Sequence, residues 1–146
     1  MIQRIQSIWL LFAALLSFAG LRLPFYAGMR TVSSAETNPV AVTQQMEFVN
    51  GNSNFILLLL SIAVFILPLV IIFLYKNRGT QIRLCLVSMF LEVGVLVSYF
   101  MEIKNFSSGA LALTSILQAF VLFFLFLAIR GIRNDERIIR ESERLR

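Results

Sequence analysis

The stretch "FILLLLSIAVFILPLVIIFLY", residues 55–75, decides the fold class, because it carries no charged side chain anywhere along its length. A helix needs about 20 mostly apolar residues to cross the ~30 Å hydrocarbon core of a bilayer. Residues 55–75 therefore predict a membrane-spanning helix.

Three further apolar stretches lie on either side of it, at residues 5–21, 84–101 and 110–130. The chain is 58% hydrophobic and only 14% charged, whereas soluble domains carry about a quarter charged residues. We expect one integral membrane domain over residues 1–146, with the all-α fold of a four-helix transmembrane bundle.

The first stretch has a cleavable signal peptide as its alternative interpretation, because Arg4 precedes a short apolar run that ends in "SFAG". Apolar residues continue beyond that motif through Leu21, Leu23 and Phe25. This continuation favours a span that is retained.

The basic residues predict the orientation of the bundle. All thirteen Lys and Arg residues except Arg22, Arg30 and Lys104 flank the ends of the spans that lie on one side. Cytoplasmic flanks of membrane helices are enriched in Lys and Arg, so both termini should be cytoplasmic. Residues 22–54, which are rich in Ser, Thr, Asn and Gln, should then form an extracytoplasmic loop that is mobile or loosely packed.

Composition also narrows the chemistry. The chain has no His and a single cysteine, Cys85, so we expect no metal, no cofactor and no catalytic residue. Glu36 and Glu47 lie in the polar loop without evident partners, which argues against an enzyme. The net charge is +5, and the basic residues lie at the ends of the spans. This placement favours contact with membrane lipids and argues against binding to nucleic acid.

Glu92 is the one acid within the predicted spans. At helical spacing it shares a face with Ser88, and Gln118 in the fourth span lies at a comparable depth. These three residues form a candidate intramembrane polar site. Glu92 either couples a proton or ion to transport, or is a neutral carboxylic acid that bonds neighbouring helices; the second interpretation is favoured, since no other charge lies within the spans.

The chain ends in "RNDERIIRESERLR", in which oppositely charged residues recur at helical spacings of three and four. Residues 131–146 therefore predict a charged cytoplasmic helix that continues the fourth span. The candidate contacts of this tail with a protein partner or with lipid headgroups are Arg133, Asp135, Glu136, Arg140, Arg144 and Arg146. An equally open alternative is a solvated helix that makes no such contact and only fixes the orientation of the protein in the membrane.

Both ends of the chain resemble a known family. The start "MIQRIQSIWLLFAALL", the "LPFY" after the first span and the ending "AIRGIRNDERIIRESERLR" are similar to the domain of unknown function 4293 family, small four-span inner-membrane proteins of Bacteroidota. The resemblance implies an inner-membrane location and no known activity. It is specific only at the two ends, so it lends no support to Glu92.

Two functions remain open. The first is a non-enzymatic accessory or scaffolding subunit of a membrane complex, which binds a cytoplasmic protein through its tail. The alternative is a small transporter or channel subunit, a homo-oligomer in which Glu92 is the coupling site.

Overall fold

The computed structural model describes residues 3–33, 42–74 and 77–144, with side chains for residues 6–30, 45–74, 77 and 79–138. The helices are α1 (Gln3–Arg22), α2 (Phe55–Phe73), α3 (Arg78–Ile103) and α4 (Ile116–Arg144), with a short 3-10 helix, η1 (Leu113–Ser115), before α4. The strands are β1 (Tyr26–Ser33), β2 (Val42–Val49) and β3 (Ser108–Leu111). The all-α expectation is therefore wrong in one respect: a small sheet accompanies the helices.

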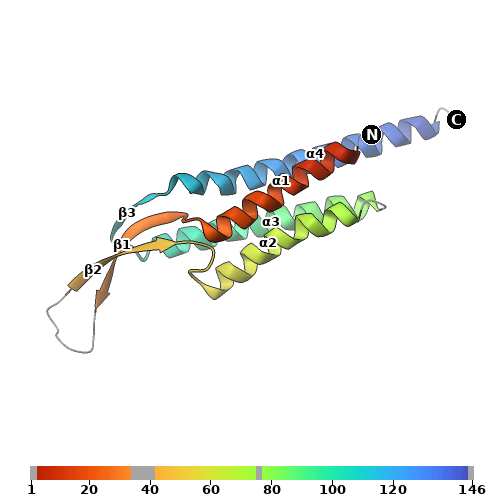
Figure 1. Cartoon of the computed structure of the whole chain (residues 1–146). Coiled ribbons are helices and arrows are strands. Elements are labelled where there is room, and N and C mark those ends of the chain that lie inside the picture. Colours follow the sequence, from red (N-terminus) through yellow and green to blue (C-terminus); the bar gives the residue numbers. More distant parts are fainter. Residues whose placement is uncertain (1–2, 34–41, 75–76, 145–146) are drawn as a thin grey trace.

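The four helices form an antiparallel bundle. Contacts join α1 to α2, α2 to α3, α3 to α4 and α4 back to α1, which closes the ring. Figure 1 shows the N-terminal end of α1 beside α4 at one end of the bundle and the sheet at the other. The blue end of α4 continues beyond the other three helices.

The helices pack through stripes of buried residues that recur at steps of three and four, the spacing of one helix face. The buried stripe of α1 contains Gln6, Leu10, Ala13 and Ser17, and that of α2 contains Leu57, Ser61, Val64, Pro68 and Ile71. The stripe of α3 contains Gln81, Cys85, Ser88, Glu92, Val95 and Tyr99, and that of α4 contains Gln118, Val121, Leu125, Ala128, Ile132 and Asp135. Each stripe combines apolar residues with polar ones, so the interior of the bundle is partly polar.

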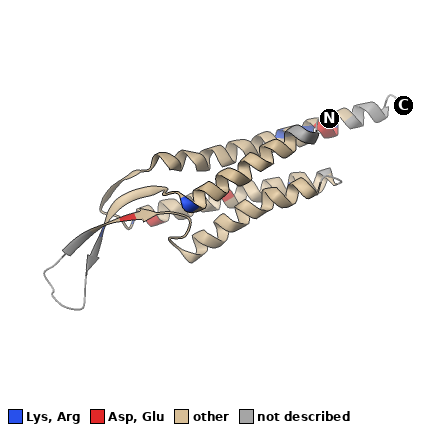
Figure 2. Ribbon diagram, viewed as in Figure 1, with Lys and Arg blue, Asp and Glu red and all other residues tan. Residues whose placement is uncertain are grey.

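The outer surface of the bundle is apolar. Large side chains such as Phe73, Phe90 and Phe123 are exposed on it. In Figure 2 the charged residues lie mostly towards the two ends of the bundle, and most of its length is uncharged. Three segments, Phe55–Phe73, Gly79–Ile103 and Leu113–Ile138, are long and apolar enough to cross a membrane, and the apolar part of α1, Gln6–Arg22, is shorter. The chain is thus a membrane protein by length and composition.

Two parts of the predicted loop 22–54 are strands rather than loosely packed chain, residues 26–33 (β1) and 42–49 (β2), whereas residues 34–41 lie outside the described residues. β1 and β2 pair as antiparallel neighbours, with Tyr26 opposite Val49 and Arg30 opposite Gln45. The interpretation from composition failed because Ser, Thr and Gln are also tolerated on the exposed positions of a strand, where apolar and polar residues alternate.

The predicted fourth span, 110–130, also begins differently. Ala110 and Leu111 belong to β3, which pairs with β1, and the α-helix begins only at Ile116. Small residues before this point favour an extended chain, and the free edge of β1 supplies backbone partners. At the other end, α4 continues through Gly131 to Arg144, as expected for the tail helix.

The sheet is joined to the bundle by contacts around Pro24 and Phe25. The amide of Phe25 donates to the carbonyl of Val49 at 2.7 Å, and the carbonyl of Phe25 accepts from the amide of Ala112 at 3.0 Å. The Thr114 hydroxyl donates to the carbonyl of Pro24. The Phe25 ring stacks on Tyr99 of α3 with 4.2 Å between ring centroids, so the sheet has a fixed place on the bundle.

Two glycines allow β1 and β3 to lie side by side. Gly28 and Gly109 are opposite each other, and the rings of Tyr26 and Phe106 meet edge to face nearby, 5.5 Å apart. A Cβ on Gly109 would lie 2.5 Å from the carbonyl oxygen of Ala27 and 2.6 Å from the Cα of Gly28. Because both are backbone atoms, no rotamer change can relieve the clash.

Gly109→Ala should therefore separate β3 from β1 while leaving the four helices intact. Amide hydrogen exchange in β1 and β3 should become faster, with little change in helical circular dichroism. Gly94→Ala is the matched control, because a Cβ at Gly94 meets nothing within 4 Å. Equal exchange protection in the Gly109 variant and the wild type would contradict this account of the sheet.

Candidate functional site

Glu92 lies inside the bundle with only 1% of its surface exposed. It is flanked on the same buried face of α3 by Ser88, one turn before it, and by Tyr99, two turns after it. An acid on a lipid-facing surface would have no hydrogen-bond partner, so the position of Glu92 sets which face of α3 turns inward.

Tyr99 brings groups of the other helices together. Its hydroxyl donates to the carbonyl of Gly20 in α1 at 3.3 Å. The Tyr99 hydroxyl is also close enough to the polar side chains of Gln118 in α4, Ser61 in α2 and Glu92 to interact with them. The Gln118 amide packs directly on Gly20, where a Cβ would come within 2.4 Å of Nε2. All four helices therefore contribute to one polar cluster, which we call the Tyr99 cluster: Gly20, Ser61, Glu92, Tyr99 and Gln118.

Several buried oxygen atoms in and near this cluster have no hydrogen-bond partner among the described residues. They are Ser17 Oγ, Ser61 Oγ, Ser88 Oγ, Glu92 Oε1 and Gln118 Oε1. A buried polar atom without a partner costs about 1–3 kcal/mol. The atoms are hydroxyl, amide and carboxyl oxygens, which can hydrogen-bond to a polar guest or, at the carboxyl, take up a proton.

The three residues predicted as a polar site, Glu92, Gln118 and Ser88, are all buried in the same bundle. No hydrogen bond joins Glu92 to either of the others in the described part of the chain. Thr114, four residues before Gln118 in sequence, lies in η1, where its hydroxyl donates to the carbonyl of Pro24. Sequence reasoning missed Ser17, Gly20 and Ser61, although small and polar residues at spacings of three and four in apolar helices are a signal for inward-facing positions.

In the part of the chain that the structure describes, no group of three or more His, Cys, Asp and Glu residues could hold a metal ion. Glu47, which had no evident partner in the sequence, lies in β2 and forms an ion pair with Arg30 at 3.4 Å. Glu36 lies outside the described residues.

A second polar contact lies at the opposite end of the bundle, near the N-terminus. The buried amide Nε2 of Gln6 in α1 donates to Oδ2 of Asp135 in α4, which is also buried. One turn earlier, Gly131 lets α1 approach closely, since a Cβ there would lie 3.1 Å from Cγ of Gln6. The start of the tail helix is thus attached to α1 rather than free of the bundle.

The residues predicted to make contacts from the tail differ in exposure, and only some of their side chains are described. Arg133 is exposed and Glu136 is half-buried, whereas Asp135 faces α1 and is removed from the exposed surface. Arg140 and Arg144 belong to the described backbone of α4, but their side chains lie outside the described residues, as does all of Arg146. The exposed surface of the tail therefore begins with Arg133, Asn134 and Arg137.

Asp135→Ala should destabilise the protein by about 1–3 kcal/mol, because it leaves the buried amide of Gln6 without an acceptor. Gln6→Leu combined with Asp135→Leu should recover part of this loss, since it removes both polar groups together. Thermal unfolding of the purified protein in detergent measures both effects. Asn134→Ala, on the exposed side of the same turn, is the control, and an equal loss in that variant would argue against the Gln6–Asp135 contact.

Residues 2–145 match the family model described as Domain of unknown function (DUF4293). No curated protein and no solved structure matches the chain.

Proposed function

The chain belongs to the DUF4293 family, and we propose that it is a four-span protein of the bacterial inner membrane with both termini in the cytoplasm. In this arrangement α1 crosses the membrane together with the three longer apolar helices. The antiparallel contact of α1 with both α2 and α4 supports this, as does the polar cluster to which all four helices contribute. The excess of Lys and Arg around the end that carries the termini supports the orientation.

Within the membrane the protein acts as a non-enzymatic accessory or scaffolding subunit of a complex. The observation that carries this proposal is the form of α4, which runs from the bundle to Arg144 as one helix and projects beyond the other three (Figure 1). The buried contact between Gln6 and Asp135 fastens the base of the projection to α1. A helix held in this way presents its outer residues to a partner at a fixed angle, which lowers the entropy lost on binding.

The exposed residue Ile138 gives a direct test of the projection. It is an apolar side chain with 43% of its surface exposed, beyond the Gln6–Asp135 contact. A photo-crosslinking amino acid at position 138, expressed in native membranes, should yield one discrete protein adduct that mass spectrometry identifies. The adduct should form again when the crosslinker is placed in the partner instead.

The same amino acid at Phe90 is the control for this experiment. Phe90 is 79% exposed on the apolar surface of α3 and should label lipid alone. Identical adduct patterns at positions 138 and 90, or no protein adduct at position 138, would contradict the scaffolding function.

A second candidate function is favoured by the Tyr99 cluster. A small transporter or channel subunit, assembled from several copies of the chain, would use Glu92 as its proton or ion coupling site. The supporting observation is the buried carboxyl oxygen of Glu92, which has no hydrogen-bond partner among the described residues. Because the carboxyl can gain and lose a proton, it is the one group of the cluster suited to coupling.

Glu92→Gln should then reduce proton or cation flux through reconstituted protein to the level of protein-free liposomes. Glu102→Gln is the matched control, because Glu102 lies at the end of α3 and bonds to Asn54 at 2.7 Å rather than to the cluster. Equal flux through the wild type and the Glu92 variant would exclude Glu92 as the coupling site, and flux absent from both would argue against transport; either result leaves Glu92 as a structural residue.

A further inference from the structure

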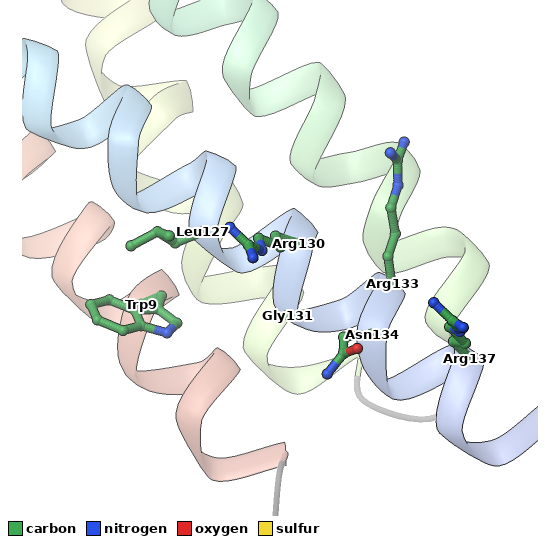
Figure 3. A pocket seen from close by; sticks show the side chains of 7 residues that line it. All are labelled: Trp9, Leu127, Arg130, Gly131, Arg133, Asn134 and Arg137. Carbon is green, nitrogen blue, oxygen red and sulfur yellow. The ribbon is translucent and has the colours of Figure 1, made fainter.

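A groove opens on the outer surface of α4 where it meets the beginning of α1. It has a volume of about 510 Å³, which is comparable to the roughly 300–1,000 Å³ of pockets that hold small ligands. Its lining residues are Trp9 from α1 and Leu127, Arg130, Gly131, Arg133, Asn134 and Arg137 from α4 (Figure 3). We refer to it as the arginine groove.

The arginine groove is apolar at one end and cationic at the other. Figure 3 shows Trp9 of α1 beside Leu127 of α4, with Arg130 next along α4 and Arg133 and Arg137 further towards its end. The Trp9 ring is held in place by stacking on Phe124, with 5.6 Å between centroids. A ligand that fits this lining has an apolar part beside an anionic part.

The groove also lies where the membrane surface is expected. The apolar run of α4 ends at Ile129, and Arg130 is the first charged residue after it. Tryptophan is enriched at the same level of membrane proteins, where its ring meets both lipid and water. The acyl chains and the headgroup of a phospholipid meet at this depth.

The charges in the groove are not cancelled by the neighbouring acids. Arg130 and Arg133 form no ion pair with any side chain that the structure describes. Of the two nearby acids, Asp135 is buried and bonded to Gln6, and Glu136 already interacts within the protein. Arg137 likewise has an interaction of its own, so the binding of an anion rests mainly on Arg130 and Arg133.

We propose that the arginine groove binds the headgroup of an anionic phospholipid. The Arg130 guanidinium, which lies beside the apolar end of the groove, binds the phosphate, because its planar N–H donors match the phosphate oxygen atoms. The Arg133 side chain extends away from Arg130 in Figure 3 and joins it on the phosphate by a change of rotamer. The Asn134 amide is placed to donate to polar atoms of the headgroup, and Trp9 and Leu127 contact the start of the acyl chains. Basic pockets between membrane helices on the cytoplasmic side are known to hold anionic lipids.

The chain has one tryptophan, and it lies in this groove, so its fluorescence reports on the lipid directly. In nanodiscs of mixed composition, brominated phosphatidylglycerol should quench Trp9 more strongly than brominated phosphatidylcholine. Two arginines near a membrane surface favour an anionic lipid on the order of tenfold. Equal quenching by the two lipids in the wild-type protein would overturn the proposal without any variant.

Arg130→Gln combined with Arg133→Gln should abolish the preference for phosphatidylglycerol, with helical circular dichroism unchanged. The control, Arg83→Gln combined with Lys104→Gln, removes two exposed charges away from the groove and should keep the preference. Loss of the preference in both double variants would point to the net charge of the protein and overturn a specific site. Suppression of the quenching by millimolar inorganic phosphate would assign the groove to a free anion rather than a lipid.

Discussion

Four apolar helices each carry polar side chains, and a lipid environment has nothing to which those groups can hydrogen-bond. This constraint sets the rotation of every helix about its axis. Glu92, Ser61, Gln118 and Ser17 all face the interior, and the apolar faces that remain are turned outward. The ring of contacts from α1 to α4 follows from it, because burial of these residues on four helices requires the helices to enclose a common centre.

The position of the sheet depends on the same buried side chains in the interior of the bundle. Tyr99 bonds to Gly20 through its hydroxyl and stacks on Phe25 through its ring, so one side chain joins the polar cluster to the first residue before β1. A change within the cluster therefore has a direct physical route to the sheet.

The other end of the bundle brings the two termini together. Gln6 of "MIQRIQ" and Asp135 of "IRNDE", the stretches that carry the resemblance to the family, are hydrogen-bonded to each other. Beside this contact lies the arginine groove, and beyond it α4 projects. The attachment of the tail thus shares one small region with the lipid site and the partner surface that we propose, and a lipid in the groove would help to fix the angle of the projecting helix.

The sequence by itself determined the membrane class, the helical stretches and the continuation of the last helix, because these depend on local hydropathy and helical spacing. It also singled out Glu92, since a lone acid in an apolar run is visible without any partner. The tertiary structure decided the rest. The sheet pairs Gly28 with Gly109, and the polar contacts join Gly20 to Tyr99 and Gln6 to Asp135, residues too far apart in sequence for a local pattern to connect them. Such pairings arise only when the bundle closes, and composition had assigned two of the strands to a loose loop.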